Sequence, residues 1–298
     1  MVELRNIATE QRNPNTMNID TLSTLDMVTL INREDHNVAH AVGLVADQIA
    51  KAVDLITERL SKGGRLIYCG AGTSGRLGIL DAVECPPTYS TEPEMVQCLM
   101  AGGYGAIFKA VEGAEDSKEL GAEDMEKIQF SAADVLVGIA ASGRTPYVLG
   151  CMEYAKSLGA STIAVTCCPG SVLDRFADIG IAPAPGPEVV TGSTRMKSGT
   201  AQKMVLNMLS TGAMIKLGKV YGNLMVDVKP SNEKLIRRCV TIVCSATECD
   251  ESTAVAALEA CDYRPKVAIV MVLCGVGPEE ARQMLQKADG RVAKALNL

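Results

Sequence analysis

The chain has 298 residues with a formal net charge of −6, and 47% of them are hydrophobic against 21% charged. This composition predicts one or two globular domains and excludes a wholly disordered chain. The negative charge argues against a nucleic-acid partner, which would require a basic footprint. Because aromatic residues are 3% and tryptophan is absent, a base-stacking surface is excluded too, and any bound sugar would be held by hydrogen bonds.

The cysteines indicate a reducing compartment. All 11 are scattered along the chain without paired CxxC spacings, which fits neither a zinc site nor a disulfide framework. The first residues lack the pattern of an export signal. The longest apolar stretch, Val267–Gly277, is roughly half the length of a membrane-spanning helix. We therefore expect a cytoplasmic protein that does not enter a membrane.

The N-terminal part predicts an arm followed by helices. Residues 1–33 are polar and predict an arm with a short helix near Leu22–Ile31. A long helix is predicted from Val38 to the glycine pair at 63–64, because apolar residues recur there every three or four positions. These residues are Val42, Val45, Ile49, Val53, Ile56 and Leu60.

Two strand–loop–helix units follow. In the first, strand 65–69 leads into the glycine-rich turn 70–75 and a helix through Leu80. In the second, the apolar strand 134–140 leads into loop 142–146 and helix 147–158, and a further strand is predicted at 161–166. Buried strands that alternate with helices predict a doubly wound parallel α/β sheet of three layers, flavodoxin-like, with ligands beyond the carboxyl ends of the strands.

The C-terminal part predicts mostly helices. The polar loop 191–197 precedes a helix at 202–217, and three short helices are predicted at the end of the chain. These three helices are predicted at 252–260, 265–274 and 278–288. We therefore expect two domains: residues 1–247, which contain the sheet and the N-terminal arm, and residues 248–298, which form a small helical module.

The two glycine-containing loops have the parts of a phosphate site. A helix N-terminus offers unpaired amides, glycines allow an anion to approach, and Ser and Thr add hydroxyl donors. Loop 70–75 lacks the Walker ending and does not complete the dinucleotide fingerprint, so nucleotides are disfavoured. Tight turns with capping Ser and Thr remain the alternative for either loop alone.

Two acidic residues are candidates for proton transfer. Glu84 stands where the predicted helix ends before Pro86 and Pro87, ten residues past Ser74, and this places it within reach of the same crevice. For Glu115, in a glycine-containing turn beside a helix start, the residues alone favour an ordinary capping turn.

A metal site is not expected. His36 and His40 are four residues apart on one helix, but no third ligand accompanies them, so a solvated helix face is favoured.

Taken together, several motifs resemble the N-acetylmuramic acid 6-phosphate etherase family over nearly the whole chain. The resemblance implies a sugar isomerase (SIS) domain with a small helical C-terminal module. It also implies a cytoplasmic homodimer whose site lies near the subunit interface and which needs no metal or redox cofactor. The motifs are Thr9–Asn13, Asn18–Leu22, Gly70–Gly78, Glu84–Thr88, Val111–Ser117, Ala141–Tyr147 and Gly192–Thr200.

The resemblance also implies roles for residues. Glu84 takes the proton-donor position and Glu115 that of the second acid, assigned as the base, against the capping turn favoured above. The implied reaction cleaves the C3 lactyl ether of a sugar phosphate, giving N-acetylglucosamine 6-phosphate and D-lactate. The substrate would be held by Ser74, Ser142 and Thr145 at its phosphate, with Thr73, Gly143, Arg144, Ser193 and Thr194 completing the predicted set.

Two other functions remain open. An aldose–ketose isomerase on the same fold would also begin by removing a proton next to the sugar carbonyl. A non-catalytic sugar-phosphate sensor would bind without turnover, either as a transcription regulator or as a glucokinase-type regulator. Residues 1–60 lack a basic recognition helix, and the second kind of sensor would be a longer chain, so the sequence disfavours both.

Overall fold

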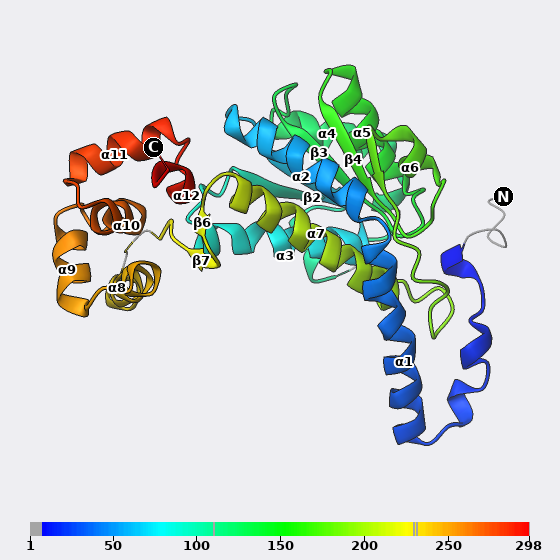
Figure 1. Cartoon of the computed structure of the whole chain (residues 1–298). Helices are drawn as coiled ribbons and strands as arrows, with labels where there is room; N and C mark the ends of the chain where they lie inside the picture. The colour runs from blue at the N-terminus through cyan, green and yellow to red at the C-terminus, as the bar shows by residue number, and fades with distance from the viewer. Residues whose placement is uncertain (1–7, 110, 229, 231, 298) are drawn as a thin grey trace. The chain divides into compact units, whose positions relative to one another are not determined.

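The computed structural model describes residues 8–109, 111–228, 230 and 232–297. The chain divides into two compact units, each discontinuous in sequence (Figure 1). The first comprises residues 1–83 and 93–210, and the second comprises residues 84–92 and 211–298. Among the described residues, no helix combines the length and apolar character needed to cross a membrane.

A five-stranded parallel sheet forms the centre of the first unit. Its order is β2-β1-β3-β4-β5, and β1 pairs with β3 so that Gly70 lies opposite Ile139. The loops that follow these two strands therefore leave the same edge of the sheet at the same level, as predicted. The strands are β1 (Leu66–Gly70), β2 (Val96–Met100), β3 (Val135–Ile139), β4 (Ser161–Val165) and β5 (Ile179–Ile181).

Helices cover both faces of this sheet, which confirms the predicted three-layer α/β fold. Alternation along β1 places Ile67 and Cys69 in the core beneath α5 (Pro146–Ser157), which also packs on α4 (Lys118–Lys127). Tyr68 points the other way, and its hydroxyl donates to Asp81 Oδ2 of α3 (Gly72–Tyr89) at 2.7 Å. Ser210 of α7 (Lys197–Lys216) donates to the other carboxylate oxygen.

Short elements complete the first unit. The described part of the N-terminal arm contains three 3₁₀ turns, and two more, η5 and η6, follow β2. They are η2 (Ala8–Glu10), η3 (Pro14–Thr16), η4 (Ile19–Thr21), η5 (Tyr104–Ile107), η6 (Ala114–Asp116) and the helix α6 (Val172–Phe176).

The predicted N-terminal helices are divided differently in the structure. One helix, α1 (Thr24–Gly43), begins at the Ser23 cap, and α2 (Ala46–Ser61) starts anew after Leu44 and Val45. The prediction of a short helix and then a long one from Val38 is therefore wrong in its boundary. The apolar period runs through the break unchanged, so it carries no sign of the chain's change of path.

Helix α3 also departs from its predicted end. It continues past Leu80 to Tyr89, with Pro86 and Pro87 inside it, so the prolines do not end the helix as predicted. A proline removes one helical hydrogen bond and yet is tolerated where neighbouring bonds persist. Here the Ser90 amide donates to the Pro86 carbonyl oxygen at 2.9 Å and closes the last turn.

The second unit is built around the C-terminal helices. The hairpin of β6 (Val220–Tyr221) and β7 (Leu224–Met225) leads to α8 (Glu233–Thr247), and the apolar faces of the helices share one core. The longer segment of this unit starts at Thr211 and includes α8, which packs on α9 and α10. The three predicted helices are confirmed as α9 (Glu251–Glu259), α10 (Pro265–Cys274) and α11 (Pro278–Lys287), and α12 (Val292–Ala295) follows them.

Candidate functional site

A cavity of about 270 Å³ lies in the first unit beside the N-terminal end of α3. Its walls come from the β1–α3 turn, from the end of β2 and from the loops around η5 and η6. The lining residues are Ala71, Gly72, Arg76, Met100, Ala101, Ala106, Val111, Glu112, Gly113 and Glu115. The cavity therefore combines a helix N-terminus, one cation and two carboxylates, so a polar ligand would meet both hydrogen-bond donors and carboxylate acceptors there.

The turn into α3 requires glycine at two places. Gly72 has a φ of +53°, which L residues with a side chain rarely adopt. A Cβ on Gly75 would lie 2.7 Å from the carbonyl oxygen of Gly70, so the helix start packs directly on the strand end. This close approach leaves the first amides of α3 at the sheet edge.

Arg76 was missed by the sequence analysis as a site residue. Its guanidinium donates to the carbonyl oxygens of Ile107 (2.7 Å) and Ala106 (2.8 Å) while lining the cavity. Arg76 thus fixes the η5 turn and supplies positive charge to the cavity. Tyr104, the first residue of this turn, and Phe108, which directly follows it, pack edge to face with ring centroids 5.8 Å apart, and both are exposed.

Glu115 lies in η6, a turn that begins directly after Gly113, and Gly113 has a φ of +76°. The exposed side chain of Glu115 lines the cavity. The capping function belongs to its neighbour Ser117, whose Oγ accepts from the Leu120 amide at 3.0 Å. The capping role and the acid are therefore on different residues, and Glu115 is left facing the cavity.

Glu84 belongs to the part of α3 assigned to the second unit, and its side chain is exposed. Twelve positions separate it from Gly72 in the sequence of α3. Among the described residues, the lining of the 270 Å³ cavity includes Glu115 but not Glu84.

Thr73 and Ser74 lie in the first turn of α3. Ser74 is buried, and its Oγ donates to Oε1 of Gln202 on α7 at 3.0 Å. In the described part of the chain, the amide nitrogen of Gln202 has no hydrogen-bond partner although it is buried. Neither of the two predicted residues lines the cavity.

The second predicted loop, 142–145, follows β3 at the same sheet edge. Thr145 is the N-cap residue of α5, but its hydroxyl does not accept from the helix amides. Gly143 has a φ of +65°, and a Cβ there would collide with the side chain of Ser171. Ser142 is half-buried and Arg144 is exposed, and neither lines the cavity.

Ser171 is a further residue that the sequence analysis missed. It is buried beside Gly143, and its Oγ has no hydrogen-bond partner within the described ranges. A buried unpartnered hydroxyl at the edge where ligands are expected is a possible ligand donor. The sequence signal was the turn Pro169–Gly170–Ser171, separated by two residues from the end of the third predicted strand.

The third loop, with Ser193 and Thr194, is held by a buried carboxylate. Glu188 accepts from the amides of Lys197 and Ser198, both at 2.9 Å, and so caps the N-terminus of α7. The amide of Gly199 donates to the Thr194 carbonyl oxygen at 2.9 Å. These bonds tie the loop to the start of α7.

A buried ion pair at Lys197 also holds the start of α7, where the third loop ends. Lys197 Nζ lies 2.7 Å from Glu34 Oε2, with side chains 1% and 5% exposed. The amides of Asn13 and Asn15 donate to the two oxygens of Glu34 at 2.7 and 2.8 Å. Burial tends to raise the pKa of Glu34, but these three hydrogen bonds outweigh it and hold the pKa below its ordinary range.

Comparison with known proteins agrees with this fold. The profile of the SIS domain family matches residues 115–212, and that of the glucokinase regulatory protein N-terminal SIS domain matches residues 48–156. The chain is 57% identical to the N-acetylmuramic acid 6-phosphate etherase of Klebsiella aerogenes over 99% of both proteins. This chain belongs to the N-acetylmuramic acid 6-phosphate etherase family. The resemblance inferred from the sequence motifs is thereby confirmed.

Other relatives place the etherase family in a wider structural context. The etherase of Photorhabdus laumondii is also 57% identical, over 99% of this chain and 98% of its own. The solved structure of phosphoheptose isomerase from Neisseria gonorrhoeae is 17% identical, with a TM-score of 0.51 over 64% of this chain and 98% of that one. At that identity the likeness concerns the fold alone.

Proposed function

We propose that the protein cleaves the lactyl ether of N-acetylmuramic acid 6-phosphate in the cytoplasm, as a step of cell-wall amino-sugar recycling. The products are N-acetylglucosamine 6-phosphate and D-lactate, with net addition of one water. The observation that carries this proposal is the 57% identity to a named etherase over 99% of both chains, which spans both compact units.

The cavity in the first unit supports an elimination that begins at carbon. In the ring-opened sugar, the hydrogen on C2 is next to the aldehyde and can be removed by a carboxylate. Glu115 is the base in this proposal, because its exposed carboxylate lines the cavity near the N-terminal end of α3. The electron pair of the C2–H bond forms the C2–C3 double bond and expels the lactyl oxygen from C3.

The departing oxygen requires a proton, and Glu84 is the proposed donor. Water then adds to C3 of the unsaturated aldehyde as Glu84 takes up its proton, while Glu115 returns a proton to C2. The residues thus exchange acid and base roles, and both end in their starting protonation states. Glu84→Gln and Glu115→Gln keep the side-chain shape, and we expect each to slow lactate release by about 10²–10⁴.

The phosphate is proposed to lie at the sheet edge, held by Ser74, Ser142 and Thr145. A 180° rotation of the Gln202 amide would let its unpartnered nitrogen donate to Ser74 Oγ, so that the Ser74 hydroxyl proton becomes free for the phosphate. Thr145 brings a hydroxyl that does not cap α5. Thr73, Gly143, Arg144, Ser193 and Thr194 complete the proposed substrate site.

The active form is proposed to be a homodimer in which the site lies near the subunit interface. The large apolar side chains of Leu25 and Val28 on α1 are exposed, as an interface would require. Glu115 and Glu84 belong to different compact units, and the site is proposed to take Glu115 from one copy and Glu84 from the other.

Mixing two inactive variants tests that arrangement. Combined Glu84→Gln and Glu115→Gln chains form heterodimers with one complete site if the acids come from different copies. We then expect about a quarter of the wild-type activity after equal mixing and exchange of subunits. Activity that stays at the level of the separate variants would place both acids in one chain.

One assay decides the reaction itself. Purified protein is incubated with N-acetylmuramic acid 6-phosphate in deuterated water, and lactate and deuterium at C2 are measured together. Lactate release with deuterium at C2 is expected. Ketose formation without lactate would show that the protein is an isomerase and not an etherase. Binding of the sugar phosphate without any product would show that it is a sensor.

A further inference from the structure

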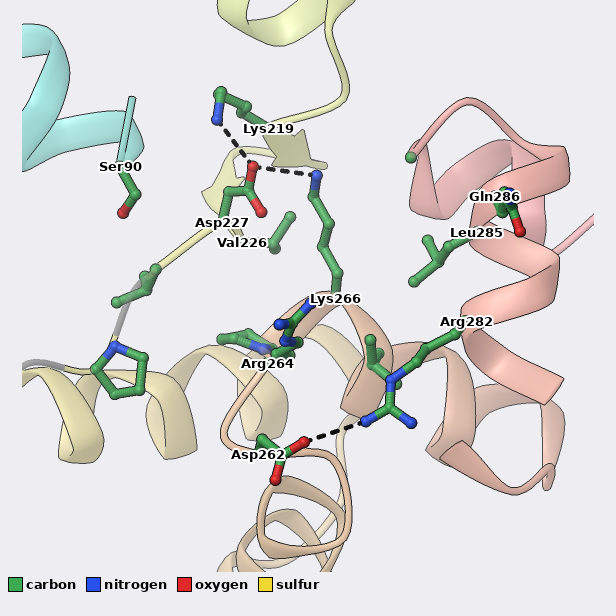
Figure 2. Close-up of a pocket in the computed structure, with 15 residues that line it drawn as sticks. Ser90, Lys219, Val226, Asp227, Asp262, Arg264, Lys266, Arg282, Leu285 and Gln286 are labelled. Carbon is green, nitrogen blue, oxygen red and sulfur yellow. Dashed lines mark hydrogen bonds and ion pairs between the residues drawn. The ribbon is translucent and has the colours of Figure 1, made fainter. Parts of the chain in front are cut away.

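The second compact unit contains a larger cavity, of about 840 Å³ (Figure 2). Its described lining comes from Ser90, from the segment around β6 and β7, from the start of α10 and from α11, all within the second unit. The volume is within the range of small-molecule sites. None of the residues proposed for the etherase reaction lines it.

The lining is positively charged. Four cationic side chains, Lys219, Arg264, Lys266 and Arg282, face two carboxylates, Asp227 and Asp262, in the part of the wall that the structure describes. Four positive charges less two negative charges leave a formal charge of +2, in a protein whose net charge is −6. A cationic hollow on an acidic protein attracts anions selectively.

The two lysines share one carboxylate. Asp227 Oδ2 lies 2.9 Å from Lys219 Nζ and 3.3 Å from Lys266 Nζ, as the dashed lines of Figure 2 show. Both lysine side chains are largely buried, 14% and 15% exposed. Burial lowers the pKa of Lys266, and the nearby Lys219 charge lowers it further against the opposing effect of Asp227. Two lysine charges beside one carboxylate leave one positive charge, which a bound anion would neutralise.

The two arginines of the cavity, Arg264 and Arg282, have no short ion pairs within the described ranges. Arg282 approaches Asp262 at 3.4 Å and Glu279 at 3.6 Å, both longer than a good charge-assisted hydrogen bond. Arg264 is exposed at the cavity, and within the described ranges its guanidinium has no ion pair or hydrogen bond. Guanidinium groups present paired N–H donors that match the oxygens of a phosphate.

The rest of the wall indicates what accompanies the anion. Val226, Val267 and Leu285 provide apolar surface, and Ser90 and Gln286 provide neutral hydrogen-bonding groups. No aromatic side chain is present among the described lining residues, so a nucleobase would have nothing to stack on. A polar body with hydroxyl groups fits this wall better than a nucleotide.

We propose that this cavity binds a phosphorylated sugar, with the phosphate on Arg264, Arg282 and Lys266. The sugar hydroxyls would meet Ser90, Gln286 and Asp262. The proposal rests on the lining of the second unit alone and does not depend on the reaction proposed for the first.

Reactivity of Lys266 provides a local readout in the full-length protein. Acetylation by acetic anhydride is followed residue by residue with mass spectrometry, with and without millimolar N-acetylglucosamine 6-phosphate. We expect the sugar phosphate to slow acetylation of Lys266 at least about fivefold, since the phosphate would cover the amine. An unchanged rate would overturn the proposal without bearing on lactate release.

Two other probes separate the parts of the ligand. Unphosphorylated N-acetylglucosamine is expected to give no protection of Lys266 at the same concentration. Inorganic phosphate is expected to protect at least about tenfold less strongly than the sugar phosphate. Equal protection by phosphate alone would refute recognition of the sugar.

Variants then locate the site. The double variant Arg264→Gln and Arg282→Gln should raise the sugar phosphate concentration needed for protection at least about tenfold, since two charged donors are lost. Arg237→Gln is the matched control, because Arg237 is an exposed arginine of the same unit outside this cavity. Glu115→Gln should leave the protection of Lys266 intact, and its loss there would refute a separate site. The wild-type measurements decide the proposal even if the double variant does not fold.

Discussion

Replacing Lys197 by methionine tests the buried ion pair beneath the third loop. Methionine keeps the length of the side chain but removes the charge, which leaves Glu34 with its bonds from Asn13 and Asn15 only. Removing one partner of a buried pair destabilises proteins by about 3–5 kcal/mol. Because two amide hydrogen bonds survive, we expect the free energy of unfolding at pH 7 to fall by about 3 kcal/mol, the lower end of that range.

The effect should depend on pH in a defined direction. The pKa of Glu34 is below its ordinary value of 4.5 in the folded protein, so its stabilisation is present above that pH and is lost as pH falls through the folded pKa. In the variant the carboxyl group lacks its cation and takes up a proton more readily. The difference between wild type and variant should therefore shrink between pH 7 and pH 4.

Urea unfolding followed by far-ultraviolet circular dichroism measures both quantities. The matched control is Lys62→Met, which removes an ion pair of similar length, 2.6 Å to Glu58, whose side chains are 66% and 54% exposed. This control should lose less than about 1 kcal/mol. If Lys197→Met is no more damaging than the control, or equally damaging at both pH values, the buried pair does not stabilise the loop as argued.

Three further predictions concern the first unit. Gly143→Ala places a Cβ at a positive φ and against the side chain of Ser171. The melting temperature should therefore fall by an amount equivalent to at least about 2 kcal/mol of unfolding free energy, and an unchanged melting curve would contradict the close approach. Burial tends to raise the pKa of Asp134, but hydrogen bonds from Arg65 and from backbone amides lower this pKa overall. Asp134→Asn should therefore reduce the free energy of unfolding by about 2 kcal/mol at pH 7 and by much less below pH 3, as the unfolding midpoint measured across an acid titration would show. Burial raises the pKa of Cys167 to about 12, so iodoacetamide at pH 8 should leave this thiol unmodified in the folded protein and alkylate it in urea, as peptide mass spectrometry would show.

The fold was largely predictable, because the strands at its centre are continuous apolar runs. Strand β3 is buried at every residue and its sequence shows this directly. The two strands that were missed lie at the edges of the sheet. Strand β2 carries Gln97 and is half-buried in its middle, and β5 has only three residues, so neither forms an apolar run.

The candidate site was predictable only in part. Loops that follow adjacent parallel strands must share an edge, so the placement of loops 70–75 and 142–146 followed from the alternation of elements alone. The role of Glu34 had no such signal, because its partner Lys197 is 163 residues away and nothing local to either residue indicates pairing. Arg76 was equally hidden, since its acceptors are backbone carbonyl oxygens that any residue provides.

The second unit takes residues 84–92 from the middle of the chain and the rest from its end. During synthesis the ribosome therefore releases the end of α3 long before residues 211–298 exist to surround it. A single cut in the gene cannot yield both halves intact, because a chain ending at 210 keeps an orphaned helical turn with its two prolines and a chain starting at 211 lacks it. Anyone who wishes to study the C-terminal portion alone must first graft that segment back, or permute the chain so that it becomes contiguous.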